Sequence, residues 1–190
     1  MSKIAIVYHS GYGHTKKQAE AVHAGALSVT PTVELIAIDA EGNVSEAGWA
    51  SLNAADAIVF GSPTYMGSVS WQFKKFADAS SKPWFTQAWK DKIAAGFTNS
   101  ASMNGDKLST LHYLFTLAMQ QSMIWVGTGT MPSNAKAAQR NDSNFLGSFA
   151  GAMAQSPSDS SPDEGPLPGD LETAKQFGKR IAETAAKFGK

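Results

Sequence analysis

IAIVYHSGYGHTK, residues 4–16, joins an apolar run to a turn that contains two glycines, a serine and a threonine. The apolar run, Ile4 to Tyr8, is rich in β-branched residues, which is typical of a strand buried on both faces of a parallel sheet. From Thr15 to Leu27, apolar side chains recur at roughly helical spacing. A strand, a glycine-containing loop and a helix in this order make either a tight turn or a pocket of backbone N–H groups for an anion.

The rest of the chain continues the alternation of strands and helices, which predicts a parallel sheet covered on both faces. Further strands are expected at 32–39, 57–60, 92–97 and 123–126, and helices at 15–27, 71–79, 108–121 and 172–188, with the end of a short helix at 52–56. Five strands fit an α/β, three-layer, doubly wound sandwich with strand order 2-1-3-4-5, whereas a TIM barrel needs more elements. The chain is therefore expected to be a single domain spanning residues 1–190.

Two helices are expected to present a buried stripe to this sheet, and two polar segments are expected to be loops. The stripes consist of Trp71, Phe73 and Phe76 in one helix, and of Phe177, Ile181, Ala185 and Phe188 in the last. The loops, at 128–146 and 155–169, are rich in polar residues; the second also contains several prolines, serines and aspartates. The final helix must still cover the sheet, so these segments are loops within the domain and not linkers.

Composition excludes several classes of function. The chain has no Cys, which rules out disulfides, thiolate metal sites and a Cys nucleophile, so redox chemistry would need a bound cofactor. The formal net charge is zero, which does not favour a nucleic-acid partner or an anionic membrane. No apolar stretch is long enough to span a bilayer, and the N-terminus is too short for a signal-peptide core. A cytoplasmic location is expected.

The loop at 9–16 favours a phosphate of one particular kind. Gly11 and Gly13 let the backbone approach a ligand closely, and Ser10 and Thr15 add hydroxyl donors. An ATP or GTP P-loop would need Gly-Lys-Ser/Thr, which is absent, and the third glycine of G-x-G-x-x-G is replaced by Lys16. A loop suited to a monophosphate remains, with a tight turn as the alternative.

Two more loops should meet this one at the same edge of the sheet, because parallel strands end at a common edge. The third strand is followed by GSPTYMG, residues 61–67, and the fourth by TNSASMNG, residues 98–105. The first of these offers Pro63, Tyr65 and Met66 to pack against a flat ring. The second supplies polar backbone groups for a ring's heteroatoms.

These three loops together resemble the flavodoxin-like proteins, and in particular the WrbA-type NAD(P)H:quinone oxidoreductases, which bind FMN. The resemblance rests on SGYGHT, GSPTYMGSVSWQFKKFAD and TNSASMNG and extends over essentially the whole chain. It implies three groups of FMN-binding residues. The phosphate group is Ser10, Tyr12, Gly13, His14 and Thr15. The groups flanking the ring are Pro63, Thr64, Tyr65, Met66 and Gly67 on one side, and Thr98, Asn99, Ser100, Ala101, Ser102 and Gly105 on the other.

The resemblance also implies a homo-oligomer, dimer or tetramer, and residues near the electron acceptor. Trp84 falls where the family has a Trp that approaches the flavin from a neighbouring subunit; packing under its own loop is the alternative. Gln120 and Gln121 replace a pair of histidines found in the family, and Gln121 is the expected acceptor contact. A glutamine can donate a hydrogen bond to a quinone oxygen but cannot supply a proton near neutral pH.

The function expected from these features is transfer of two electrons from NADH or NADPH, through FMN, to a quinone-like small molecule. No catalytic side chain is assigned, because the chemistry centres on the flavin, and no metal site is expected, since His9, His23 and His112 show no ligand spacing. The alternatives are a flavodoxin-type electron carrier without turnover of its own, a reductase of free flavin, azo or nitro compounds, and a regulatory module that keeps only the fold.

Overall fold

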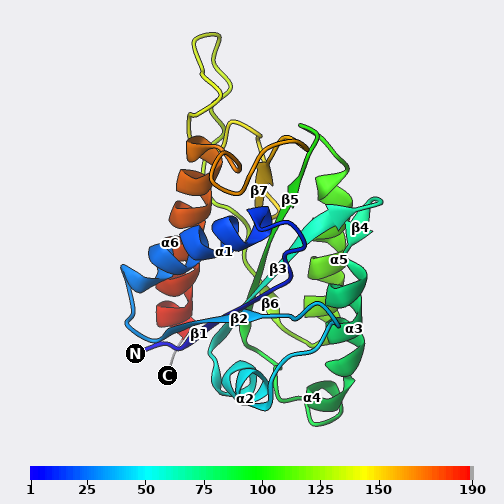
Figure 1. The fold of residues 1–190 in the computed structure, drawn as a ribbon. Coiled ribbons are helices and arrows are strands. Elements are labelled where there is room, and N and C mark those ends of the chain that lie inside the picture. The colour runs from blue at the N-terminus through cyan, green and yellow to red at the C-terminus, as the bar shows by residue number, and fades with distance from the viewer. Residues whose placement is uncertain (189–190) are drawn as a thin grey trace.

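The apolar segments pair as a parallel sheet in the order β2-β1-β3-β5-β6, which confirms the predicted winding. The computed structural model describes residues 1–188, and Figure 1 shows the sheet between two groups of helices. Strand β1 pairs with both of its neighbours, Ile4 lying opposite Val33 of β2 on one side and Ala57 of β3 on the other. The five strands are β1 (Ile4–Tyr8), β2 (Val33–Ala37), β3 (Ala57–Tyr65), β5 (Ile93–Ser100) and β6 (Ile124–Trp125).

The fifth strand position is shared by two segments that lie far apart in the sequence. β6 pairs with the start of β5, whereas β7 (Ala152–Gln155) pairs with its end, and both run parallel to it. Residues 126–151 form an excursion between them, part of which projects beyond the body of the molecule (Figure 1). The sequence did not predict β7, because AMAQ is short and contains no β-branched residue.

The prediction that β3 stops at residues 61–63 is wrong. The strand continues to Tyr65, with Pro63 opposite Asn99 of β5, and then pairs antiparallel with the short β4 (Ser68–Val69). The chain reverses instead at Met66 and Gly67, whose φ angles are 47° and 79°. Because of this extension, the second loop begins level with the carboxyl end of β5, measured along the strands.

Helices cover both faces of the sheet. Alternate strand residues point to opposite faces, so each strand contributes to two separate hydrophobic cores, one under each group of helices. Where α1 crosses α6, Gly25 lies against the backbone of Lys175 and Gly178 against that of Val22, so a side chain at either glycine would collide with backbone. One face carries α1 (His14–Leu27) and α6 (Pro168–Phe188); the other carries α2 (Glu46–Ala54), α3 (Trp71–Ala79), α4 (Ser81–Phe85) and α5 (Lys107–Gln120).

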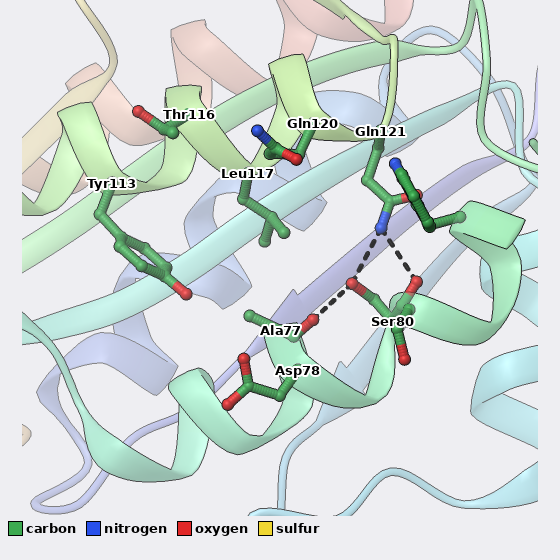
Figure 2. Close-up of a pocket in the computed structure, with 10 residues that line it drawn as sticks. Ala77, Asp78, Ser80, Tyr113, Thr116, Leu117, Gln120 and Gln121 are labelled. Carbon is green, nitrogen blue, oxygen red and sulfur yellow. Dashed lines mark hydrogen bonds between the residues drawn. The ribbon is translucent and has the colours of Figure 1, made fainter.

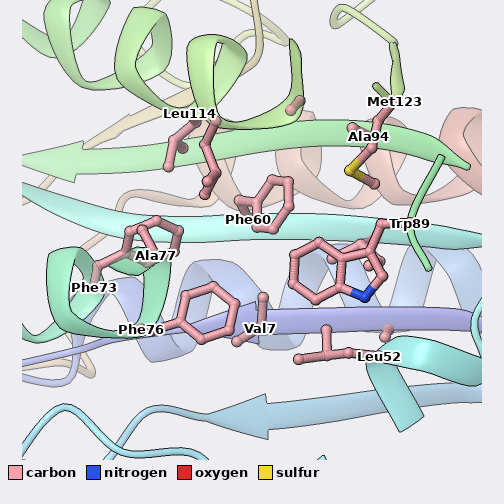
Figure 3. Close-up of a cluster of buried hydrophobic side chains, with 14 of the residues drawn as sticks. Val7, Leu52, Phe60, Phe73, Phe76, Ala77, Trp89, Ala94, Leu114 and Met123 are labelled. Atoms are coloured by element: carbon pink, nitrogen blue, oxygen red, sulfur yellow. The ribbon is translucent and has the colours of Figure 1, made fainter. Parts of the chain in front are cut away.

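An aromatic cluster fills the core beneath α2, α3 and α5 (Figure 3). Phe60 packs edge-on against Phe73 and lies beside Trp89, and all three side chains are fully buried. Two residues predicted to lie inward do not. Trp71 is 61% exposed because it occupies the first turn of α3, and Phe188 is 60% exposed near the end of α6.

Within residues 1–188, no helix is long and apolar enough to cross a membrane, and no group of three or more His, Cys, Asp or Glu side chains is arranged to hold a metal ion.

Candidate functional site

The N-terminus of α1 forms a cradle of backbone donors at the carboxyl end of β1. Lys16 N–H donates to Ser10 Oγ, at 3.1 Å, and Lys17 N–H donates to Gly13 O. Within the described part of the chain, the N–H groups of His14 and Thr15 have no acceptor, and the helix has neither a side-chain cap nor an acidic residue in its first turn. Unpaired N–H groups at the positive end of a helix dipole suit a phosphate.

Gly13 makes this cradle possible. Its φ of 91° is left-handed, a conformation that strains any residue with a Cβ atom. A Cβ at this position would also lie 2.6 Å from Cγ of Pro162, so the loop and the segment above it are in close contact.

A cleft of about 520 Å³ extends from this cradle along the ends of β3 and β5. Its volume falls in the range typical of small-molecule and cofactor sites. The first loop contributes three residues to the lining, as do the second and third, so the structure brings the three predicted loops together. The residues of these loops that line the cleft are Tyr12, His14, Thr15, Pro63, Thr64, Tyr65, Asn99, Ser100 and Ala101.

A fourth segment, which follows β7, was missed by the sequence analysis. Residues 156–158 and Ser160 complete the lining of the cleft. This segment is tied to α1 in two places: His14 Nε2 lies 3.0 Å from Ser160 O, and Lys17 Nζ lies 2.9 Å from a carboxylate oxygen of Asp163. The sequence signal was only a Pro- and Ser-rich composition, which predicts a loop but does not place it over another loop.

The two long walls of the cleft differ in chemistry. One wall carries Tyr65, whose ring meets that of Tyr12 edge-to-face with centroids 6.2 Å apart. Burial, with a smaller effect from Tyr12, raises the pKa of Tyr65, so its phenol stays neutral near neutral pH. The opposite wall consists of the small and polar residues 99–101. An aromatic ring on one side and short side chains on the other leave room for a flat molecule between them.

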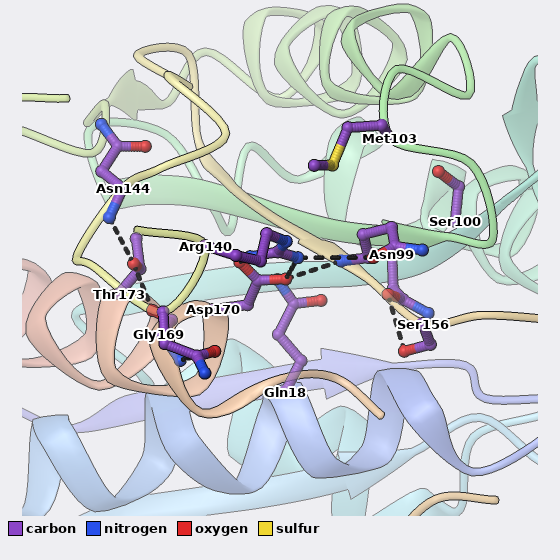
Figure 4. A network of polar contacts seen from close by, with 12 residues as sticks. Gln18, Asn99, Ser100, Met103, Arg140, Asn144, Ser156, Gly169, Asp170 and Thr173 are labelled. Atoms are coloured by element: carbon purple, nitrogen blue, oxygen red, sulfur yellow. Dashed lines mark hydrogen bonds and ion pairs between the residues drawn. The ribbon is translucent and has the colours of Figure 1, made fainter. Parts of the chain in front are cut away.

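A polar network supports the wall at residues 99–101 from behind (Figure 4). Arg140 forms a two-pronged ion pair with Asp170, at 2.8 and 2.6 Å, and thereby anchors the excursion between β6 and β7 to α6. Gln155 N–H donates to the same carboxylate, and its side-chain amide donates to Ala101 O at 2.7 Å. Ser156 Oγ donates to Asn99 Oδ1 at 3.2 Å. The split fifth strand thus fixes the third loop.

Seven predicted cofactor-binding residues lie near the cleft but do not line it. Ser10 and Gly13 shape the cradle, and Met66 is fully exposed beside Gly67 at the tip of the second loop. Thr98 is buried in β5, where its hydroxyl lies 2.9 Å from that of Thr64. The remaining two, Ser102 and Gly105, belong to the back of the third loop, where Ser102 O accepts a hydrogen bond from Lys107 Nζ.

Gln121 and Trp84 lie at a different cavity, of about 360 Å³, between α3, α4 and α5 (Figure 2). The Gln121 amide donates to the carbonyl and the hydroxyl of Ser80, at 3.0 and 2.9 Å. This cavity is near the start of β5, because Gln121 lies three residues before Ile124, the β6 residue that pairs with Ile93. β5 is roughly 23 Å long at about 3.3 Å per residue. Within one chain, Gln121 and Trp84 therefore lie away from the cleft, and their contact with an electron acceptor stays a prediction.

The arrangement fits a flat molecule that carries one phosphate. Two free N–H donors and the Thr15 side chain meet at one end, and the space between Tyr65 and residues 99–101 extends from there. FMN has both parts, a phosphate and an isoalloxazine ring, and the residues present fit it.

Comparison with known proteins supports the same conclusion. Residues 40–138 match the family model described as NADPH-dependent FMN reductase. Flavodoxin FldP of Pseudomonas aeruginosa is 53% identical over 182 residues, covering 96% of each chain. The NAD(P)H dehydrogenase (quinone) of Geotalea uraniireducens is 30% identical over 207 residues, covering 99% of this chain and 100% of that protein. The crystal structure of a flavodoxin, WrbA-like protein from Agrobacterium tumefaciens is 52% identical and superposes with a TM-score of 0.80, covering 98% of this chain and 99% of that one.

Proposed function

This chain belongs to the FMN-binding, flavodoxin-like reductase family that includes the WrbA-like proteins, and we propose that it is an oxidoreductase that transfers two electrons from NADH or NADPH to a quinone-like small molecule. FMN, when bound, supplies the ring that accepts a hydride and passes electrons on. The protein supplies binding, orientation and access for the two substrates.

Each part of the cleft has a role in this proposal. The N–H groups of His14 and Thr15 bind the phosphate, helped by the Thr15 hydroxyl. Tyr65 packs against the ring, and the backbone and side chains of Asn99 and Ser100 face its polar edge. The segment over Gly13 limits the access of water to the phosphate.

One observation favours an enzyme: aromatic side chains occupy only one wall of the cleft. Tyr12 and Tyr65 lie on that wall, whereas residues 98–105 contain no aromatic side chain. A ring held against Tyr65 would have one face free for a nicotinamide and then for an acceptor. Hydride transfer needs such a face, because the reacting atoms must approach to about 3–3.5 Å.

The test is anaerobic addition of NADH or NADPH to the FMN-loaded protein, followed in the visible spectrum. The proposal predicts rapid bleaching of the flavin, and steady turnover when benzoquinone is then supplied. A flavin that binds but remains oxidised would contradict it. Parallel assays with free FMN, an azo dye and a nitroaromatic would show whether one of these is a better acceptor than the quinone.

A second candidate, a flavodoxin-type electron carrier, is favoured by the 53% identity to a protein named a flavodoxin. Carriers are typically acidic for docking to redox partners, whereas this chain has no net charge. A carrier would be reduced by a separate reductase but not directly by NADH or NADPH.

We also propose a homo-oligomer, in which Trp84 of a neighbouring copy would approach the cleft. The mass in solution, measured by sedimentation velocity, tests this separately from the reaction. A monomer at micromolar concentration would contradict it.

A further inference from the structure

A buried ammonium group lies directly behind the third loop of the cleft. Lys107, the first residue of α5, is 1% exposed. Its Nζ donates three hydrogen bonds of 2.8 Å, to Ser100 Oγ, Ser102 O and Met103 O. Since an ammonium has three N–H donors, all of them are used, and all are directed at this loop. Ser100 itself lines the cleft, so the charge lies one side chain behind the wall.

Among residues 1–188, no carboxylate forms an ion pair with the Lys107 ammonium. Asp170 of α6 attracts it from a distance and Arg140 opposes this effect, but these two residues are paired with each other at 2.6 Å. The adjacent Asp106 is exposed and forms no ion pair with it among the described residues. Burial removes the hydration of a charge, and the three hydrogen bonds from Lys107 offset that cost only in part because no counter-ion adds to them.

We propose that protonated Lys107 is a positioning residue for the cofactor: it holds the third loop in the shape that forms the cleft wall, and it supplies the positive charge that favours an anionic flavin nucleotide there. The ligand in this inference is the FMN of the proposed function. What this inference adds is the role of Lys107. This residue lies outside the three predicted loops, and its protonation makes the shape of the third loop depend on pH.

The direction of the pH dependence follows from the burial. Burial lowers the pKa of Lys107 from its ordinary value to about 8, against the weaker attraction of Asp170. Binding of an anion favours the charged form and therefore raises this pKa again. FMN affinity should be at its full value below about pH 8 and should decline above it, as the free protein loses the proton that the complex retains.

The experiment is a calorimetric titration with FMN between pH 7 and 9.5, comparing the wild-type chain with Lys107→Met and Lys107→Arg. Lys92→Met is the matched control. Lys92 is half-buried, burial lowers its pKa, and its Nζ donates to the carbonyls of Leu52 and Asn53 at the opposite edge of the sheet. Ionisation of FMN itself is common to all four proteins, so it cancels in their ratios.

The inference predicts that wild-type affinity falls above pH 8, by about tenfold in total for each unit by which FMN raises the pKa of Lys107. The Lys107→Met chain should bind more weakly at pH 7 and approach the wild type at pH 9.5. The Lys107→Arg chain should keep its affinity at high pH, since an arginine stays protonated. The Lys92→Met chain should follow the wild type at every pH.

Two results would overturn the inference while leaving the proposed function intact: a Lys107→Met profile parallel to that of the wild type, or a Lys107→Arg profile that falls like the wild type. If the wild-type chain does not bind FMN at pH 7, the proposed function itself fails. Thermal unfolding of each apo-protein shows whether the variant folds. If Lys107→Met does not fold, the pH profile of FMN affinity for Lys107→Arg still tests the inference.

Discussion

Replacing Gly13 with alanine should damage the cradle in two ways that can be measured separately. Its φ of 91° is left-handed, and a Cβ there costs about 1–2 kcal/mol. The same Cβ would lie 2.6 Å from Cγ and 3.1 Å from Cβ of Pro162. The segment at 156–165, which covers Gly13, must therefore move, and such overpacking costs about 1–3 kcal/mol of unfolding free energy. The expected loss of unfolding free energy is therefore about 2–5 kcal/mol, the sum of these two terms.

The cofactor should be affected as well, because residue 13 orients the N–H groups of His14 and Thr15. Loss of one hydrogen bond to a charged phosphate is worth about 1.5–3 kcal/mol, or about 10- to 150-fold in FMN affinity. Fluorescence titration with FMN and thermal unfolding of the apo-protein measure the two effects.

Gly147→Ala is the matched control for Gly13→Ala. Gly147 has a similar φ of 67°, but its nearest neighbour for a Cβ is Pro132 at an ordinary 3.9 Å, away from the cleft. The Gly147→Ala substitution should lower the unfolding free energy only by the cost of a Cβ atom at a left-handed φ angle, about 1–2 kcal/mol, and should leave FMN affinity unchanged. If Gly13→Ala binds FMN as tightly as Gly147→Ala does, the cradle is not the phosphate site and the reasoning is refuted.

Three further substitutions test other parts of the account. Thr15→Val removes a hydroxyl from a residue that lines the cleft, and should weaken FMN binding by about 10- to 150-fold in a titration; unchanged affinity would exclude Thr15 from the phosphate site. Asp170→Asn leaves Arg140 without its charge partner and should cost about 3–5 kcal/mol in denaturant unfolding; a loss below about 1 kcal/mol would show an ordinary surface pair. Phe73→Ala empties part of the aromatic core and should cost about 3–5 kcal/mol, with FMN affinity retained by the folded fraction.

The sheet could be predicted because most of its strands can be recognised from a short stretch of sequence. Each central strand is a short run of apolar residues bounded by turn residues, as at Ile4–Tyr8, and the alternation with helices fixes a parallel sheet. The divided fifth strand could not be predicted, since AMAQ is recognisable as a strand only by its pairing with Phe97–Ser100. The exposure of Trp71 was likewise decided by its position in the first turn of a helix and not by its apolar character.

The three cleft-forming loops were predictable for the same reason: each follows a recognisable strand, and parallel strands end at one edge. The covering segment at 156–165 was not, because its place over α1 depends on contacts such as Lys17 with Asp163, far apart in the sequence. Lys107 was also missed. A lysine at the start of a helix normally faces solvent, and only the fold shows that its ammonium is directed into the third loop.

The most direct test of the central claim, that the N-terminus of α1 binds the phosphate of a flavin nucleotide, compares FMN with riboflavin. The two ligands share the ring and differ by the phosphate. Calorimetric titration of the apo-protein should give FMN at least about 100-fold higher affinity, the value of roughly two charge-assisted hydrogen bonds. Equal affinities for FMN and riboflavin would contradict the account, because they would mean that the cradle at His14 and Thr15 binds no phosphate.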